Sequence, residues 1–212
     1  MKTVCVNLYS FAELSSTAQK TAIANDRESR EQEDRFSYER GEAVNTVKAA
    51  AEVFGFKLVD WSIGADVQSS FVNLRQLDVT AAELTGVRLR TWLINNRYDV
   101  FYTKKPYGEY RDRASGMSAK SNYRYDRYSK IQFIETDCPF TGMFYDCEFL
   151  DTFREFLAKP SPDTLESLFE AAVENLCRAL EREYEYQMSD ENIRYDLELS
   201  DDAIYTEEGE LQ

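Results

Sequence analysis

The side chains best suited to metal chemistry fall in one short stretch, CPFTGMFYDCEFLD at residues 138–151. It holds two thiols and three carboxylates: Cys138, Asp146, Cys147, Glu148 and Asp151. Together they could form a mixed thiolate–carboxylate metal site. The same stretch predicts a Pro-Phe-Thr-Gly turn, because Pro139 fixes φ at a turn position and Gly142 follows shortly. We favour the turn, since the chain has no histidine and no Cys-x-x-Cys pair to complete a usual ligand set.

The absence of histidine from all 212 residues limits the catalytic chemistry that the chain can perform. Ser–His and Cys–His nucleophile pairs are impossible, and so is an HExxH zinc site. Any hydrolytic chemistry would need carboxylates alone, or carboxylates that hold a metal, so few enzyme classes stay open, and a carboxylate-metal hydrolase is the rival that we consider. We expect a protein that is not an enzyme, with no catalytic residues, no cofactor and no metal. The four scattered cysteines are expected to be reduced, half-buried thiols.

Negative charge is concentrated in the C-terminal part of the chain. Residues 1–129 hold 19 basic and 17 acidic side chains, whereas residues 130–212 hold 6 basic and 22 acidic ones, and the whole chain has a net charge of −14. Such an imbalance favours long-range attraction to basic surfaces. The carboxylates that we single out as a partner-binding face are Glu166, Glu170, Glu174, Glu181, Glu185, Asp190 and Glu191.

Two interpretations of this acidic face stay open. It is either an ordinary solvated helix surface or an array of carboxylates that imitates nucleic-acid phosphates. Duplex DNA carries one charge per about 1.7 Å of axis, and the proteins that bind it use Lys and Arg contacts. Glu166, Glu170 and Glu174 recur every four residues, which gives a stripe with steps of about 6 Å on a helix. That spacing is close to a phosphate repeat.

A basic, tyrosine-rich stretch, residues 97–130, contrasts with this acidity. It holds nine Lys or Arg, four acids and seven of the fourteen tyrosines, and it predicts a long irregular insertion. We consider three roles in order of preference: contact with a partner protein, docking against the acidic part of its own chain, and contact with nucleic acid. The candidate contact residues are Tyr107, Tyr110, Tyr123, Arg124, Tyr125, Arg127 and Tyr128.

The elements that position these residues follow from periodicity. Alternation over residues 4–9 predicts a first strand. Ser15 or Ser16 is expected to cap the next helix, with Ser16 and Gln19 as a capping box. The charge-dense stretch 26–42 predicts a solvated helix or a helix–loop. Further predictions are helices at 43–54, 80–96 and 163–188, strands at 57–63 and 69–75 forming a hairpin, a short helix from Ser189 and an edge strand near the C-terminus.

This order of elements predicts an α+β fold, in which a small antiparallel sheet packs against several helices. We expect one domain over residues 1–212, with the insertion at 97–130 and an acidic helical part at 160–212. No apolar run is long enough to span a bilayer. The N-terminus MKTVCVNLYSF lacks the features of a signal peptide, so we expect a cytoplasmic protein.

Three stretches of the chain resemble a group of phage and prophage accessory proteins. They are LYSFAELSSTAQKTAI (8–23), DCPFTGMFYDCEFLD (137–151) and YEYQMSDENI (184–193), the last followed by an acidic tail near YTEEGEL. The resemblance covers most of the chain except roughly residues 97–130. It implies a small accessory protein of mobile elements, whose genes often encode inhibitors of bacterial defence or regulators of host machinery. It carries over no catalytic residues.

These observations predict a non-enzymatic inhibitor that acts in the bacterial host cytoplasm. Its acidic face would compete for the basic groove of a nucleic-acid-handling defence complex, of the CRISPR or restriction type, as a DNA mimic. It would bind no nucleic acid itself and no membrane. The alternative is a nucleic-acid-binding regulator or antitoxin that uses residues 97–130.

Overall fold

The computed structural model describes residues 7–64, 66–77, 79–101, 110–111, 118–119, 138–200 and 203–211. Helices dominate and the strands form small sheets, so the α+β prediction is confirmed. The chain forms two compact units. Unit 1 comprises Met1–Asn45, Trp61–Val72 and Glu174–Gln212, and unit 2 comprises Thr46–Asp60 and Asn73–Val173. None of the described helices is long and apolar enough to cross a bilayer.

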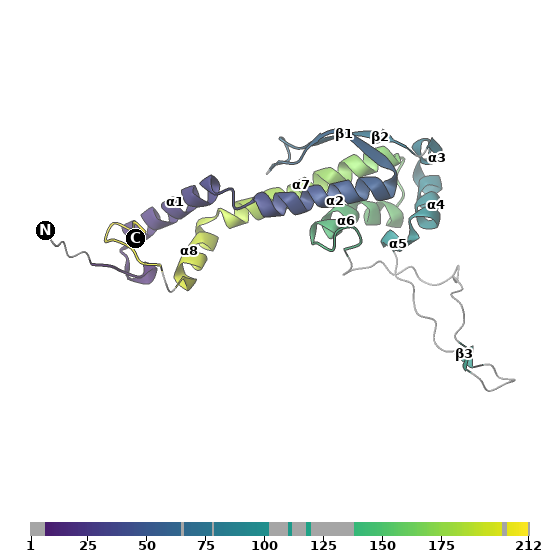
Figure 1. Ribbon diagram of the computed structural model, residues 1–212. Helices are drawn as coiled ribbons and strands as arrows, with labels where there is room; N and C mark the ends of the chain where they lie inside the picture. The colour runs from purple at the N-terminus through teal and green to yellow at the C-terminus, as the bar shows by residue number, and fades with distance from the viewer. Residues whose placement is uncertain are drawn as a thin grey trace. The chain divides into compact units, whose positions relative to one another are not determined.

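Unit 1 is built around helices from opposite ends of the chain. Helix α1 (Ser16–Gln32) lies beside α8 (Asp190–Leu199). The 3-10 helix η1 (Phe11–Glu13) precedes α1 in the chain and also contacts α8. The purple and yellow ribbons of Figure 1 show this pairing. Burial of apolar side chains joins the three elements in one core. Its members are Phe11, Leu14, Ala18, Ala22, Ile23, Ile193, Leu197 and Tyr205.

The start of α1 differs from the predicted capping pattern in one respect. Ser15 is the N-cap, and its Oγ accepts a hydrogen bond from the Ala18 N–H at 3.2 Å, as expected. The predicted Ser16–Gln19 capping box is wrong. The Gln19 amide instead donates to the Phe11 carbonyl at 3.2 Å, which ties α1 to η1. A Ser–Glu contact occurs five residues before Ser15, where the Ser10 N–H and Oγ both donate to the Glu13 carboxylate at 2.9 Å.

The charge-dense stretch 26–42, predicted as a solvated helix or a helix–loop, contains the end of α1, a turn and the start of α2 (Ser37–Phe54), and it is not wholly solvated. Arg30 is only 8% exposed, because its guanidinium lies between α1 and the chain that enters α8. It donates to Asp26 at 2.6 Å, to Asp196 at 2.7 Å and to the Gln187 carbonyl at 3.1 Å. These contacts compensate the desolvation of a buried charge, and they connect segments far apart in sequence.

Unit 2 is centred on phenylalanine rings. The C-terminal half of α2 (Ser37–Phe54) ends at Phe54, whose ring stacks on Phe153 of α6 (Tyr145–Ala158) with centroids 4.5 Å apart. Phe169, in the first half of α7 (Leu165–Gln187), meets Phe54 edge-on at 6.4 Å. Figure 1 places α3 (Val79–Ala82), α4 (Gly86–Asn96) and α5 (Tyr98–Phe101) together at one end of this unit.

The strands form two hairpins. Strand β1 (Phe56–Ser62) pairs with β2 (Phe71–Gln76), in agreement with the predicted hairpin. A second, much shorter pair, β3 (Tyr110–Arg111) with β4 (Ser118–Ala119), is antiparallel. The first half of the predicted first strand, residues 4–6, lies outside the described residues, and residues 7–9 form no continuous strand. Tyr9 and the predicted C-terminal edge strand form only isolated bridges, Tyr9 with Tyr205 and Tyr205 with Leu211.

Helix boundaries follow glycine conformation and capping. Gly55 has φ of 76° at the end of α2, as predicted, and the helices at 163–188 and after Ser189 are confirmed as α7 and α8. The single helix predicted at 80–96 is wrong, because the chain between Ala82 and Gly86 leaves helical geometry. Gly86, with φ of 55°, begins a separate helix, α4. Helix α6 was not predicted.

A close backbone approach near the C-terminus yields a stability prediction. At Gly209, φ is 89° and an added Cβ would lie 2.2 Å from the Ala18 carbonyl oxygen. We expect Gly209→Ala to lower the free energy of unfolding by about 2–4 kcal/mol in a urea titration. Gly142→Ala is the matched control: φ is 82° there, but nothing lies within 4 Å of the added atom. It should cost about 1 kcal/mol, and equal losses at both sites would contradict the steric explanation.

Candidate functional site: the acidic face of α7 and α8

Helix α7 carries most of the predicted acidic face. Its 23 residues hold six glutamates and two arginines. At about 100° per residue, five of these glutamates fall within an arc of about 100°. They are Glu166, Glu170, Glu174, Glu181 and Glu185. All except half-buried Glu181 are exposed, while the opposite side of the helix is buried in apolar core. The helical period therefore brings five of the seven predicted carboxylates onto one side of α7.

Few cations face these carboxylates. Glu174 accepts from Arg178 at 2.5 Å, an exposed i,i+4 pair that contributes little stability. Within the described part of the chain, no ion pair involves Glu166, Glu170, Glu181 or Glu185. The face thus keeps most of its negative charge.

Glu170 shows that this arrangement works against folding. Partial burial raises the pKa of its carboxyl above the ordinary value, and the charge of Glu166 one turn earlier raises that pKa further. Like charges at i,i+4 destabilise a helix. A raised pKa in the folded state means that stability is lost as pH rises through and above the unfolded value, 4.5.

This sign leads to a pH-dependent prediction. Glu170→Gln should raise the free energy of unfolding at pH 7, because the substitution removes the repelled charge. The gain should vanish at pH 3.5, where the wild-type carboxyl is protonated in both states. Urea titrations at the two pH values measure the difference. Glu52→Gln, an exposed control on α2, should show no such gain at pH 7; an equal gain there would contradict a local cause.

The two acidic residues predicted on α8 have local structural roles as well. Asp190 and Glu191 occupy the first turn, where negative charge complements the helix dipole. Ser189 caps this turn, and its Oγ accepts from the Asn192 N–H at 3.2 Å. Asp190 also pairs with Arg27 of α1. Asp190 is therefore partly neutralised, whereas Glu191 is exposed on the same turn.

Most of the tyrosine and arginine candidates are not described. Tyr107, Tyr123, Arg124, Tyr125, Arg127 and Tyr128 lie outside the described residues. Tyr110 is described only in its backbone, which pairs with Ala119 in the short hairpin. The three roles considered for residues 97–130 stay predictions.

The CPFTG stretch forms the predicted turn, and Asp146 holds it. This carboxylate is fully buried. Its Oδ2 accepts the backbone N–H groups of Phe140, Thr141 and Gly142 at 2.8, 2.7 and 3.2 Å, and its Oδ1 accepts the hydroxyls of Thr46 and Thr141 at 2.7 and 2.9 Å. Both oxygens are thus occupied by donors, which leaves no lone pair directed at a cation. Among the described residues no group of three His, Cys, Asp or Glu could hold a metal ion.

Two cysteines flank this turn. The Cys138 and Cys147 sulfurs lie 3.7 Å apart, and both side chains are half-buried, as predicted. Cys177 is fully buried instead, and Cys5 lies outside the described residues. Burial, together with the contact with Cys147, raises the pKa of Cys138 to about 11. The Cys138 thiol is therefore protonated at neutral pH, which is the opposite of an activated nucleophile.

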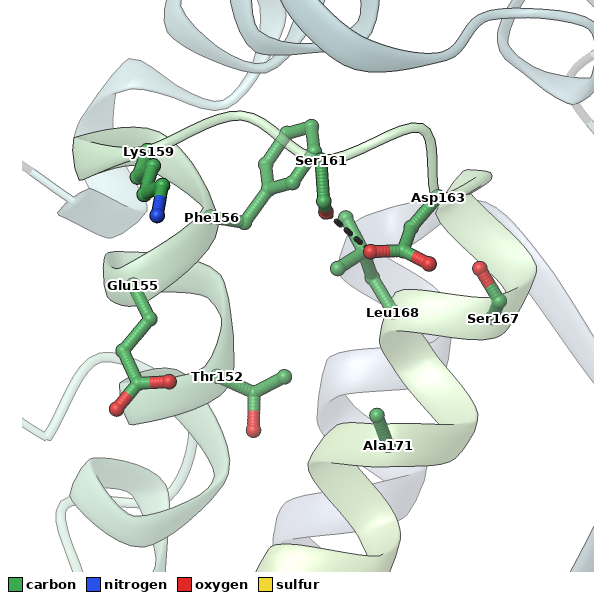
Figure 2. A pocket seen from close by; sticks show the side chains of 9 residues that line it. All are labelled: Thr152, Glu155, Phe156, Lys159, Ser161, Asp163, Ser167, Leu168 and Ala171. Carbon is green, nitrogen blue, oxygen red and sulfur yellow. Dashed lines mark hydrogen bonds between the residues drawn. The ribbon is translucent and has the colours of Figure 1, made fainter.

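One hollow in unit 2 was not predicted. It lies between the end of α6 and the start of α7 and has a volume of about 330 Å³. Figure 2 shows residues from both helices and from the connecting segment around it. Only Pro160 and Pro162, which interrupt the helices there, hinted in the sequence at a bend between two helical segments.

No protein-family model, curated protein or solved structure matches the chain. The resemblance to phage and prophage accessory proteins therefore stays a prediction from sequence motifs. The structure explains local features of all three motifs: the Ser10–Glu13 contact, the Asp146 turn and the Ser189 cap. These motif residues fix the local backbone.

Proposed function

We propose that this chain is a non-enzymatic inhibitor, encoded by a phage or prophage, that acts in the cytoplasm of a bacterial host. It binds a nucleic-acid-handling defence complex, of the CRISPR or restriction type. The glutamates of α7, with Glu191 of α8, occupy a basic groove that otherwise holds nucleic acid. The complex is then blocked because its Lys and Arg side chains are already paired.

The observation that carries this proposal is the one-sided glutamate array of α7. Five carboxylates share one side of the helix and only Glu174 has an ion-pair partner among the described residues. The repulsion between Glu166 and Glu170 opposes folding. If this face were only a solvated surface, replacing either glutamate with a neutral residue would make the protein more stable. When a basic partner is bound, the electrostatic contribution of these carboxylates becomes favourable, because each of them then meets an opposite charge.

Displacement of nucleic acid from purified complexes tests the proposal. Labelled DNA or RNA is bound to a panel of CRISPR effectors and restriction enzymes, and its release is followed by anisotropy as the protein is added. We expect release from at least one complex, and weaker release at higher salt. A variant with Glu166, Glu170, Glu181 and Glu185 changed to Gln should be about tenfold or more less potent.

The control changes the same charge elsewhere. Exposed Glu28, Glu31, Glu52 and Glu83 changed to Gln should leave potency within about twofold of wild type. If both variants lost potency equally, the effect would depend on net charge alone, and the proposal that one face of α7 binds the partner would be contradicted. Release from no complex would contradict the proposal. Retardation of the free labelled nucleic acid would favour the regulator or antitoxin instead.

A further inference from the structure

Two free thiols of unit 2 lie close together beside the turn that Asp146 holds. The Sγ atoms of Cys138 and Cys147 are 3.7 Å apart, and both side chains are half-buried, so a small thiol reagent can reach them. A disulfide bond is about 2.05 Å long, so the sulfurs must approach by about 1.6 Å, a small step for two rotating side chains. Among the described residues no third ligand completes a metal site around this pair. The two sulfurs are therefore best suited to forming a bond with each other.

The backbone next to both thiols is already fixed. Cys147 directly follows Asp146, and Cys138 precedes Phe140 by two positions. Asp146 Oδ2 accepts the N–H groups of Phe140 and Thr141 at 2.8 and 2.7 Å. These bonds tie the segment that begins at Cys138 to the first turn of α6, which carries Cys147. Because folding has already ordered this backbone, closing the disulfide adds little further entropy cost.

A ring contact connects the same two segments a second time. The Phe140 ring meets the Phe149 ring of α6 edge-on, with centroids 5.9 Å apart, and it meets Phe54 at 6.1 Å. Phe149 comes two residues after Cys147. In the unfolded chain, by contrast, eight residues separate the two cysteines, and their sulfurs meet in only a small fraction of conformations. The fold therefore raises the effective concentration of one sulfur at the other.

We propose that Cys138 and Cys147 form a reversible disulfide, a modification site at which this protein reacts with disulfide oxidants such as glutathione disulfide. One cysteine sulfur attacks a sulfur of glutathione disulfide, and a first glutathione leaves. The other cysteine sulfur then attacks the mixed disulfide, the bond between the two cysteines forms, and a second glutathione leaves. Two protein thiols are oxidised, one glutathione disulfide is reduced to two glutathione molecules, and the two thiol protons pass to them.

The reaction is expected to be slow and its product long-lived. Burial, together with the contact with Cys147, raises the pKa of Cys138 to about 11. A protonated thiol is a weak nucleophile, and a thiol with a high pKa is also a poor leaving group. The pair therefore stays reduced through a brief rise in glutathione disulfide and becomes oxidised when the rise is sustained. The site shares no residue with the glutamate face of α7, so either proposal can fail without the other.

The test compares disulfide formation in the folded and the unfolded protein. The full-length chain, either folded or in concentrated urea, is equilibrated with reduced and oxidised glutathione at a series of ratios, quenched with acid and alkylated. Trypsin releases one peptide, residues 131–154, that contains both cysteines. Mass spectrometry identifies the disulfide form, which has lost two hydrogens and carries no alkyl group. We expect an equilibrium constant for oxidation at least about tenfold higher in the folded protein. An equal or lower constant in the folded protein would overturn the proposal.

Cysteine variants identify the pair that reacts. Cys138→Ser and Cys147→Ser should each form no internal disulfide and should carry one glutathione on the cysteine that is left. The matched control, Cys5→Ser combined with Cys177→Ala, should keep the wild-type constant within about twofold. A loss of the disulfide in this control, or disulfide-linked dimers of the wild type in place of the internal bond, would overturn the proposal.

Discussion

Replacing Asp146 with alanine should lower the free energy of unfolding by about 3–5 kcal/mol. The substitution removes the acceptor for three backbone N–H groups and two hydroxyls in a buried position. The Thr46 hydroxyl would stay buried and the part-buried N–H donors of the turn would lose their acceptor, and each unsatisfied buried donor costs about 1–3 kcal/mol before the loop relaxes. Urea or guanidinium titration, followed by circular dichroism, measures the loss.

Asp151→Ala on the same helix is the matched control for Asp146. The Asp151 side chain is 54% exposed and accepts one hydrogen bond, from Arg154 at 2.8 Å. An exposed pair of this kind contributes below about 1 kcal/mol. If the two substitutions had similar effects, the donors around Asp146 would have found other partners, and its role in holding the turn would be refuted.

Phe54→Ala should have an effect of the same size, about 3–5 kcal/mol, because it opens a cavity at the centre of unit 2. The Phe54 ring is fully buried and lies within 6.5 Å, centroid to centroid, of five other phenylalanine rings. Those neighbours belong to α5, the CPFTG turn, α6 and α7, so they cannot all move inward together. Thermal and chemical denaturation would measure the loss, and near-ultraviolet circular dichroism would report the loosened aromatic packing.

The control for Phe54→Ala is the same substitution at an exposed phenylalanine. Phe144 is 64% exposed, and Phe144→Ala should cost below about 1 kcal/mol. A small effect at Phe54 would mean that unit 2 repacks around the gap, and the ring cluster would then not be its structural centre.

The elements that sequence predicts well here are those with local signals. The 3.6-residue period of α7, Gly55 after α2 and Ser189 before α8 each act within a few positions of the structure that they specify. Helix α6 also had such a signal, because Phe149, Leu150, Phe153, Phe156 and Leu157 follow helical spacing and are all buried. The Pro-Phe-Thr-Gly residues just before it favour a turn instead.

Other features depend on contacts that no local pattern contains. Arg30 is buried because Asp196, 166 positions later, supplies a carboxylate. The Asp146 carboxylate accepts the hydrogen bond of the buried Thr46 hydroxyl, 100 positions earlier. The hollow between α6 and α7 arises from the bend between two helices, which periodicity does not specify. The acidic face was predictable in composition and spacing, but the partial neutralisation of Asp190 by Arg27 was not.

The ring of Phe54 touches both borders of the long stretch between α5 and α6. Phe101 lies on one side of it, at 6.2 Å between centroids, and Phe140 lies on another, at 6.1 Å. The entry and exit points of that stretch are therefore anchored on one side chain, and closing a loop between fixed neighbouring points depends only weakly on its length. Changes in the length of the chain between these two residues should therefore alter the stability of unit 2 only slightly, because both of its borders stay packed on the same ring.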